Sequence, residues 1–471
     1  MATPLPNTLY LGSFVHSKTL TELEYLHDTA IAVDATGTIV AIEPLTPSTP
    51  TALPARLGWA PSPATTTIIR AKPGSQFFFP GFVDTHLHAP QYPNVGLFGA
   101  SSLLDWLNTY TFPLEASLSD PAKARPVYAR VIRKTLAHGT TTAAYYATVD
   151  VGSTNLLADL CLAAGQRALV GRVCMDSDLS PAYYRDEGPE EAVAATLASI
   201  AHIDRIDPGG GLVRPVLTPR FAPSCTPALL KGLGELAAQR PDVPIQTHIS
   251  ENVGEVALVR EMFPEQESYA GVYDAFGLLT GRTILAHAVH LTEGEAELVA
   301  RRGAKVSHCP CSNSAITSGA ARVRWLLEKG VVCGLGTDMS GGYSASVLEA
   351  ARQAVLVSRH VSLVESEGEG AKLSVEEVLY LATRGGAKVV GLEERVGAFE
   401  VGREWDAQLV GLGVVDGEGG LSEGGTDGEE GGVDVFGWES WEEKVAKWVF
   451  NGDDRNTRRV WVRGRLVHER K

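Results

Sequence analysis

Eight short apolar runs recur from residue 82 onward, and a longer stretch with apolar residues at helical spacing follows each of them. Alternation of this kind indicates strands joined by helices, and therefore a parallel sheet. Eight such units over about 260 residues match the size of a closed (β/α)8 barrel of the TIM type. An open, doubly wound sheet is the competing fold. The runs are Phe82–His88, Thr140–Tyr145, Leu169–Asp176, Leu212–Phe221, Ile245–Ser250, Thr283–Ala288, Ala304–Pro310 and Val332–Asp338.

Three of the intervening stretches carry clear helix signals. Apolar residues at helical spacing, with Pro or Thr near the start, predict helices over Asp120–Ala137, Thr226–Arg240 and Thr292–Arg302. The fold class is therefore predicted to be α/β. The barrel is favoured over the open sheet because chemically suggestive residues end many different strands, which is how barrels build their sites.

The two ends of the chain contain short strand-like runs separated by turn residues. We expect residues 1–79 and 396–471 to pair in a small β-sandwich-like domain beside a barrel formed by residues 80–395. Residues 411–432 hold ten glycines and six acidic residues, too little apolar surface to offset the entropy of ordering. A disordered loop is therefore predicted over residues 411–434.

The formal net charge is −15, whereas phosphate binding needs basic patches. Nucleic acid and membranes are therefore not expected partners. No apolar stretch reaches the ~18 residues that a membrane span needs, and no signal segment is evident. Six scattered cysteines make no disulfide framework, which favours a reducing, cytoplasmic location. Cys309 and Cys311 could still form a redox or metal pair, although packing is their favoured role.

The strongest local signal is the pair His86 and His88 at the end of the first barrel strand. Residues two apart on a strand point the same way, so both imidazoles should project from one face. His248, His287 and Asp338 lie at or near the ends of three other predicted strands. Each of them alone could be a core histidine or a helix cap. Together, three imidazoles and a carboxylate suit zinc or ferrous iron and leave a position open for water.

Longer motifs surround these residues. They include Pro80-Gly81-Phe82-Val83-Asp84-Thr85-His86-Leu87-His88, His248-Ile249-Ser250-Glu251 and Gly334-Leu335-Gly336-Thr337-Asp338. More specific marks are Ala89-Pro90-Gln91-Tyr92, Leu104-Asp105-Trp106-Leu107, Arg220-Phe221, His308-Cys309-Pro310 and Asp338-Met339-Ser340-Gly341-Gly342-Tyr343-Ser344. With them, nearly the whole chain resembles the metal-dependent hydrolases of the amidohydrolase superfamily, and its guanine deaminase branch in particular.

The resemblance implies that one metal ion, zinc with Fe2+ as the alternative, is bound by His86, His88, His248 and Asp338. His287 then orients the water that the metal activates. Members with two metals bridge them with a modified lysine at the end of strand four. This chain has Leu217, Thr218, Pro219 and Arg220 there, so a single metal is expected.

The resemblance also assigns the proton transfers and the substrate. Glu251 would move the water's proton to a ring nitrogen, and Asp338 would deliver a second proton to the leaving amine. Arg220 could hold the adjacent acceptors O6 and N7 of guanine, while Gln91 meets the pyrimidine edge. The expected reaction converts guanine and water to xanthine and ammonia. The residues expected to touch the substrate are His88, Gln91, Trp106, Arg220, Phe221 and His248.

Several alternatives stay open at this stage. The same metal site could serve another aminated heterocycle, such as 8-oxoguanine, a pterin or a triazine. A scaffold that keeps the barrel but has lost the reaction is less favoured, because the ligands and Glu251 are present. Trp106 could be a core aromatic instead of a stacking surface, and Glu251 a helix cap. A homodimer is expected from the resemblance alone.

Overall fold

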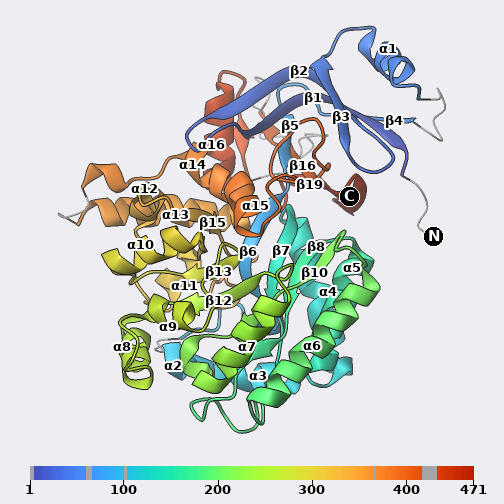
Figure 1. Cartoon of the computed structure of the whole chain (residues 1–471). Coiled ribbons are helices and arrows are strands. Elements are labelled where there is room, and N and C mark those ends of the chain that lie inside the picture. Colours follow the sequence, from blue (N-terminus) through green and yellow to red (C-terminus); the bar gives the residue numbers. More distant parts are fainter. Residues whose placement is uncertain (1–4, 60–65, 100–102, 365–367, 416–431, 471) are drawn as a thin grey trace.

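The computed structural model describes residues 5–59, 66–99, 103–364, 368–415 and 432–470. The fold is mixed α/β: a large part in which strands alternate with helices lies beneath a smaller, mostly β part (Figure 1). The predicted α/β class is therefore confirmed.

Each of the eight predicted apolar runs contains a strand. The third and fourth runs are each interrupted, so that two short strands share one position of the alternation. The strands are β6 (Phe82–His88), β7 (Thr140–Tyr146), β8 (Arg167–Gly171) with β9 (Val173–Cys174), β10 (Val213–Pro215) with β11 (Thr218–Pro219), β12 (Ile245–Ile249), β13 (Thr283–His287), β14 (Lys305–His308) and β15 (Val332–Leu335).

These strands pair in parallel. One sheet has the order β10-β8-β7-β6, a second has the order β12-β13-β14-β15, and β11 pairs with β9. Backbone contacts join the groups at both sides. Leu217 bridges to Ile245, and the amide of Asp338, just beyond β15, donates to the carbonyl of His86 in β6 at 2.9 Å. The carboxyl ends of all the strands consequently lie at one edge.

Helices follow the strands and cover their outer faces (Figure 1). The three helices predicted from sequence are confirmed, and Asp120, Thr226 and Thr292 each cap one of them with a side-chain oxygen that accepts a backbone N–H. The longer helices are α4 (Pro121–Ala137), α5 (Val151–Ala164), α6 (Pro189–Ile206), α7 (Pro227–Gln239), α8 (Val253–Met262), α10 (Glu293–Arg302) and α13 (Val347–Ser362). Shorter helical segments include α2 (Leu103–Trp106), η2 (Leu107–Thr111), α3 (Phe112–Ser117), α9 (Tyr269–Ala275), α11 (Pro310–Ala315), α12 (Val323–Glu328), α14 (Val375–Tyr380) and α15 (Gly386–Val389).

The smaller part is one eight-stranded sheet that contains strands from both ends of the chain. The expected sandwich-like arrangement therefore takes the form of a single hydrogen-bonded sheet around an aromatic core, in which Tyr10 stacks on Trp405 with ring centroids 4.0 Å apart. Its strands are β1 (Asn7–Ser17), β2 (Leu23–Val33), β3 (Ile39–Pro44), β4 (Thr66–Arg70), β5 (Gln76–Pro80), β16 (Ala407–Gly411), β19 (Thr457–Val462) and β20 (Arg465–Glu469).

The loop predicted over residues 411–434 is ordered at both ends. Gly411 ends β16, and β17 (Gly413–Val414) pairs with β18 (Asp434–Val435) in parallel. These backbone pairs explain why the ends are ordered despite their glycines. Residues 416–431 of the predicted loop lie outside the described residues. Among the helices described, none combines the length and the apolar character that crossing a bilayer requires.

Candidate metal and substrate site

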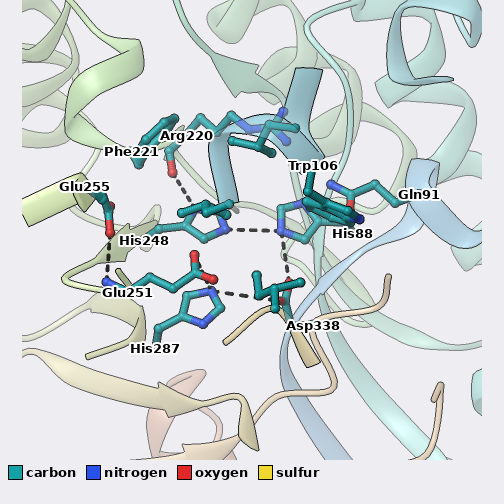
Figure 2. Close-up of a pocket in the computed structure, with 13 residues that line it drawn as sticks. His88, Gln91, Trp106, Arg220, Phe221, His248, Glu251, Glu255, His287 and Asp338 are labelled. Atoms are coloured by element: carbon teal, nitrogen blue, oxygen red, sulfur yellow. Dashed lines mark hydrogen bonds and ion pairs between the residues drawn. The ribbon is translucent and has the colours of Figure 1, made fainter. Parts of the chain in front are cut away.

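The predicted ligands meet at the carboxyl edge of the parallel strands (Figure 2). His86 and His88 come from β6, His248 from β12 and His287 from the last residue of β13, while Asp338 follows β15. His86, His88, His287 and Asp338 are buried, and His248 is partly buried. His287 and Asp338 have left-handed backbone, with φ of 73° and 45°, a strained conformation that clusters at functional sites.

The ligand atoms converge on one point. His86 Nε2 lies 3.1 Å from Asp338 Oδ1, and His88 Nε2 lies 3.3 Å from the same oxygen and 3.2 Å from His248 Nε2. Candidate ligand atoms of His86, His248, His287 and Asp338 all lie within 4.8 Å of one another. The buried Nε2 atoms of His86 and His287 make no hydrogen bond. Unpaired buried ring nitrogens around a carboxylate are what a divalent metal ion requires of its ligands.

Hydrogen bonds at Nδ1 explain why Nε2 of His248 and of His287 faces the centre of the cluster. His248 Nδ1 donates to the carbonyl of Arg220 at 2.6 Å, and His287 Nδ1 donates to Oδ1 of Asn313 at 2.8 Å. These bonds leave each Nε2 lone pair directed inward. Burial lowers the pKa of His86 to about 3 and that of His248 well below its ordinary value. Both imidazoles are therefore neutral at neutral pH, which is the form that binds metals.

Asp84 holds the segment that carries Asp338. Its carboxylate accepts from the amide of Thr337 at 3.0 Å and from the Thr337 hydroxyl at 2.6 Å, and burial raises its pKa to about 7. β6 and the segment after β15 are thus joined directly beside the ligands. Asp84 lies in the motif that ends at His88, but no role was predicted for it from the sequence.

Glu251 lies beside His287, with 3.5 Å between its Oε2 and His287 Nε2. Its Oε1 accepts from the hydroxyl of Ser318 at 3.1 Å, and burial raises its pKa to about 7. The backbone amide of Glu251 donates to Glu255 at 2.8 Å. Glu255 was missed, although it completes a capping box with Asn252 whose Asn-x-x-Glu spacing was visible in the sequence. The helix-capping role is therefore performed by Glu255, and the side chain of Glu251 faces the ligands.

A cavity opens over the ligands and contains about 410 Å³ of space not filled by protein atoms, part of it open to solvent. Five apolar side chains and eight polar ones line it. The apolar ones are Leu103, Trp106, Leu107, Phe221 and Ile316, and the polar ones are His88, Gln91, Arg220, His248, Glu251, Glu255, His287 and Asp338. All six residues predicted to touch a substrate are in this set. Trp106 lines the cavity and is also packed in an apolar cluster, so its position is compatible with both of the roles considered for it.

A buried carboxylate lies behind Arg220 and Gln91. Glu115, in α3, accepts from Arg220 Nη1 at 2.6 Å and Nη2 at 3.2 Å, from Gln91 Nε2 at 2.7 Å and from the Tyr184 hydroxyl at 2.6 Å. The end-on face of the Arg220 guanidinium is therefore occupied by Glu115, and only its remaining N–H groups are available to a ligand. The hypothesis that Arg220 holds both O6 and N7 of guanine is therefore modified, because Nη1 and Nη2 each already donate a hydrogen bond to Glu115. No sequence pattern signalled Glu115.

Cys309 and Cys311 are both buried and free of disulfides. Burial raises the pKa of both thiols, well above its ordinary value for Cys309. Neither is in the group of candidate ligands described above. The structure therefore agrees with packing roles for them.

Comparisons with known proteins agree with this site. The model of the amidohydrolase family matches residues 77–467. A curated relative from Schizosaccharomyces pombe, named probable guanine deaminase, is 46% identical over 463 residues, which cover 98% of this chain and 83% of the relative.

Two solved structures are also similar. A guanine deaminase from C. acetobutylicum, described with guanine bound in its active site, has a TM-score of 0.84 and 30% identity, with 98% of this chain and 100% of that chain covered. An adenosine deaminase from Xanthomonas campestris with bound zinc has a TM-score of 0.77 and 26% identity, with 98% and 93% covered.

Proposed function

Since the chain belongs to the amidohydrolase family, we propose that it is a guanine deaminase, which converts guanine and water to xanthine and ammonia. One observation carries the proposal. Buried histidines, Asp338 and Glu251 converge beneath a cavity lined by Arg220, Gln91 and aromatic faces. The names of the relatives, and the guanine in the active site of the C. acetobutylicum structure, support this substrate.

We propose that His86, His88, His248 and Asp338 hold one metal ion. Zinc is favoured because the similar adenosine deaminase contains it, and because three imidazoles and a carboxylate suit a borderline cation; Fe2+ is the alternative. When bound, such a metal ion acidifies water and so makes a nucleophile available at neutral pH. His287 lies in the same cluster and is proposed to orient that water.

Glu251 and Asp338 carry the protons in this proposal. Water adds its oxygen to C2 of guanine, and Glu251 takes a proton from the water and passes it to ring nitrogen N3. Asp338 then takes the second proton from the hydroxyl on C2 and delivers it to the exocyclic nitrogen, so that the C2–N bond breaks, ammonia departs and a carbonyl forms at C2. The position of Glu251 beside His287, with a hydroxyl donor on its other oxygen, supports this role. Acid and base groups of this kind contribute roughly 10² to 10⁴ in rate.

The flat base is proposed to lie between apolar and polar walls. Phe221 and Trp106 offer aromatic faces, and His88 and His248 form the floor nearest the reacting carbon. Arg220 and Gln91 approach the edge of the ring. Each of these contacts is a proposal supported by the position of the side chain in the cavity.

The domain organisation is also a proposal. We propose that residues 80–395 form one closed (β/α)8 barrel, and that residues 1–79 and 396–471 form the small β domain. The parallel pairings, the bridge of Leu217 to Ile245 and the hydrogen bond from Asp338 to His86 support closure. A homodimer in the cytoplasm remains a prediction that size-exclusion chromatography and cell fractionation would test.

Purified enzyme should be tested on guanine, 8-oxoguanine, a pterin and a triazine, with ammonia measured for every ring and xanthine measured for guanine. Guanine should have the highest kcat/KM, and a preference of about tenfold for another ring would refute the assignment. Glu251→Gln should lower kcat by roughly 10² to 10⁴ without loss of bound metal. If neither wild type nor this variant released ammonia, the chain would be a scaffold and not an enzyme, whereas equal activity in both would refute the role of Glu251.

A further inference from the structure

Glu115 makes no contact with the metal-ligand group, yet it is in contact with both polar side chains at the far wall of the cavity. It is completely buried, and four donors from three residues surround its two oxygens. Burial opposes its ionisation, but the Arg220 guanidinium holds the pKa of the carboxyl below its usual range. Glu115 is therefore an anion, and an anion accepts hydrogen bonds without donating any.

This charge determines which end of the Gln91 amide faces the cavity. Only the amide nitrogen of Gln91 can donate to a carboxylate, and it lies 2.7 Å from Glu115 Oε1. The amide oxygen is left for other partners, and the hydroxyl of Ser340 lies 3.5 Å from it. Gln91 therefore offers a hydrogen-bond acceptor to a ligand, while the adjacent Arg220 offers only donors.

The pair of side chains thus presents one donor group and one acceptor group, held in place by one carboxylate. In Figure 2, Arg220 lies above His248 and His88, Gln91 lies beside His88, and Glu251 and His287 lie below His248. A ring whose N3 faces Glu251 turns its N1 and C6 toward Arg220 and Gln91. In guanine these positions carry N1–H and a carbonyl oxygen, which match the acceptor on Gln91 and the donors on Arg220.

We propose that Glu115 is a positioning residue that restricts the site to rings with a lactam, a carbonyl beside an N–H, next to the carbon that bears the amino group. The proposal rests on the proposed function. 2,6-Diaminopurine has the same 2-amino group, but an acceptor at N1 and a donor at C6. Both groups are mismatched when Glu115 is ionised, and unpaired buried polar groups are what allow a site to reject a near-isostere.

The test compares deamination of guanine and of 2,6-diaminopurine at C2, which release ammonia with xanthine and with 6-amino-2-oxopurine respectively. Glu115→Gln removes the charge and allows the new amide to donate to Gln91, so that Gln91 can turn its nitrogen toward the ring. The ratio of kcat/KM for guanine to that for 2,6-diaminopurine should then fall by about tenfold or more. A ratio within about twofold of wild type would overturn the proposal.

Glu255→Gln is the matched control, because Glu255 is another buried glutamate of the same cavity, bonded to the amide of Glu251 and to Tyr269 instead. It should leave the ratio unchanged even if both rates fall. If Glu115→Gln does not fold, Gln91→Leu decides the question, because it removes the acceptor proposed to face the ring and leaves Glu115 bonded to Arg220 and Tyr184. Guanine turnover should then fall at least about tenfold more than diaminopurine turnover, and equal losses would overturn the proposal. Wild-type enzyme inactive on guanine would refute the proposed function instead.

Discussion

Replacing Arg167 with methionine should remove a large share of the stability of the folded chain. Arg167 begins β8, its side chain is 2% exposed, and it joins the α/β part to the small sheet. Its Nε and Nη2 donate to the two oxygens of Asp406 at 3.1 Å each, and Nη2 also donates to Glu404 at 2.6 Å. A fourth hydrogen bond runs from Nη1 to the carbonyl of Gly211 at 2.9 Å.

The size of the stability loss follows from the carboxylates that Arg167→Met leaves without a partner. Glu404 keeps its second partner, Arg395, but Asp406 is left buried with the amide of Arg463 as its remaining hydrogen bond. Breaking a buried pair from one side costs about 3–5 kcal/mol, because an uncompensated charge stays out of water. Domains are stable by only about 5–15 kcal/mol, so a loss of about 3–5 kcal/mol in Arg167→Met should lower the free energy of unfolding by about a fifth or more.

Urea unfolding at neutral pH measures this loss. Arg240→Met is the comparison, because Arg240 pairs with Asp242 and Asp204 at the surface and should contribute about 1 kcal/mol or less. Adding Asp406→Asn to Arg167→Met removes the stranded charge and should restore part of the loss. The reasoning is wrong if Arg167→Met and Arg240→Met lower the free energy of unfolding by the same amount. It is also wrong if the double variant loses the sum of what Arg167→Met and Asp406→Asn lose separately.

Three further predictions concern the site and its surroundings. Ser318→Ala removes the hydroxyl that donates to the proposed general base at 3.1 Å, so kcat should fall by roughly tenfold with KM little changed, as steady-state kinetics would show. Burial lowers the pKa of His308 to about 3, so the folded chain keeps this side chain neutral while the unfolded chain binds a proton below about pH 6.5. The contribution of neutral His308 to the free energy of unfolding is complete above about pH 6.5 and is lost as the pH falls toward about 3. When the pH is lowered from about 7.5 to about 4.5, the free energy of unfolding of His308→Gln, measured in urea, should therefore fall by about 3 kcal/mol less than that of wild type. A Cβ at Gly336 would lie 2.9 Å from that of His86, so Gly336→Ala should reduce the metal content found by elemental analysis, whereas Gly294→Ala, with open space around it, should not.

The sequence by itself determined the strands and placed the candidate ligands at their ends, because both follow from local pattern. An apolar run between helices becomes a buried parallel strand, and a residue at its end lies at the shared edge whatever the details of packing. His86, His248 and Asp338 could therefore be assigned to one site before their distances were known. The role of Glu251 was proposed from the motif that follows His248, and the structure places its side chain beside the ligands.

Only the tertiary structure decided what supports these residues. Glu115 meets Arg220 from 105 positions away, and Asp84 meets Thr337 from 253 positions away. A buried carboxylate has no periodic signature, because its partner is chosen by how helices and strands pack and not by its neighbours along the chain. The predicted ends of the glycine-rich loop were wrong for a similar reason. Backbone pairing between β17 and β18 orders these residues, and composition alone does not show that pairing.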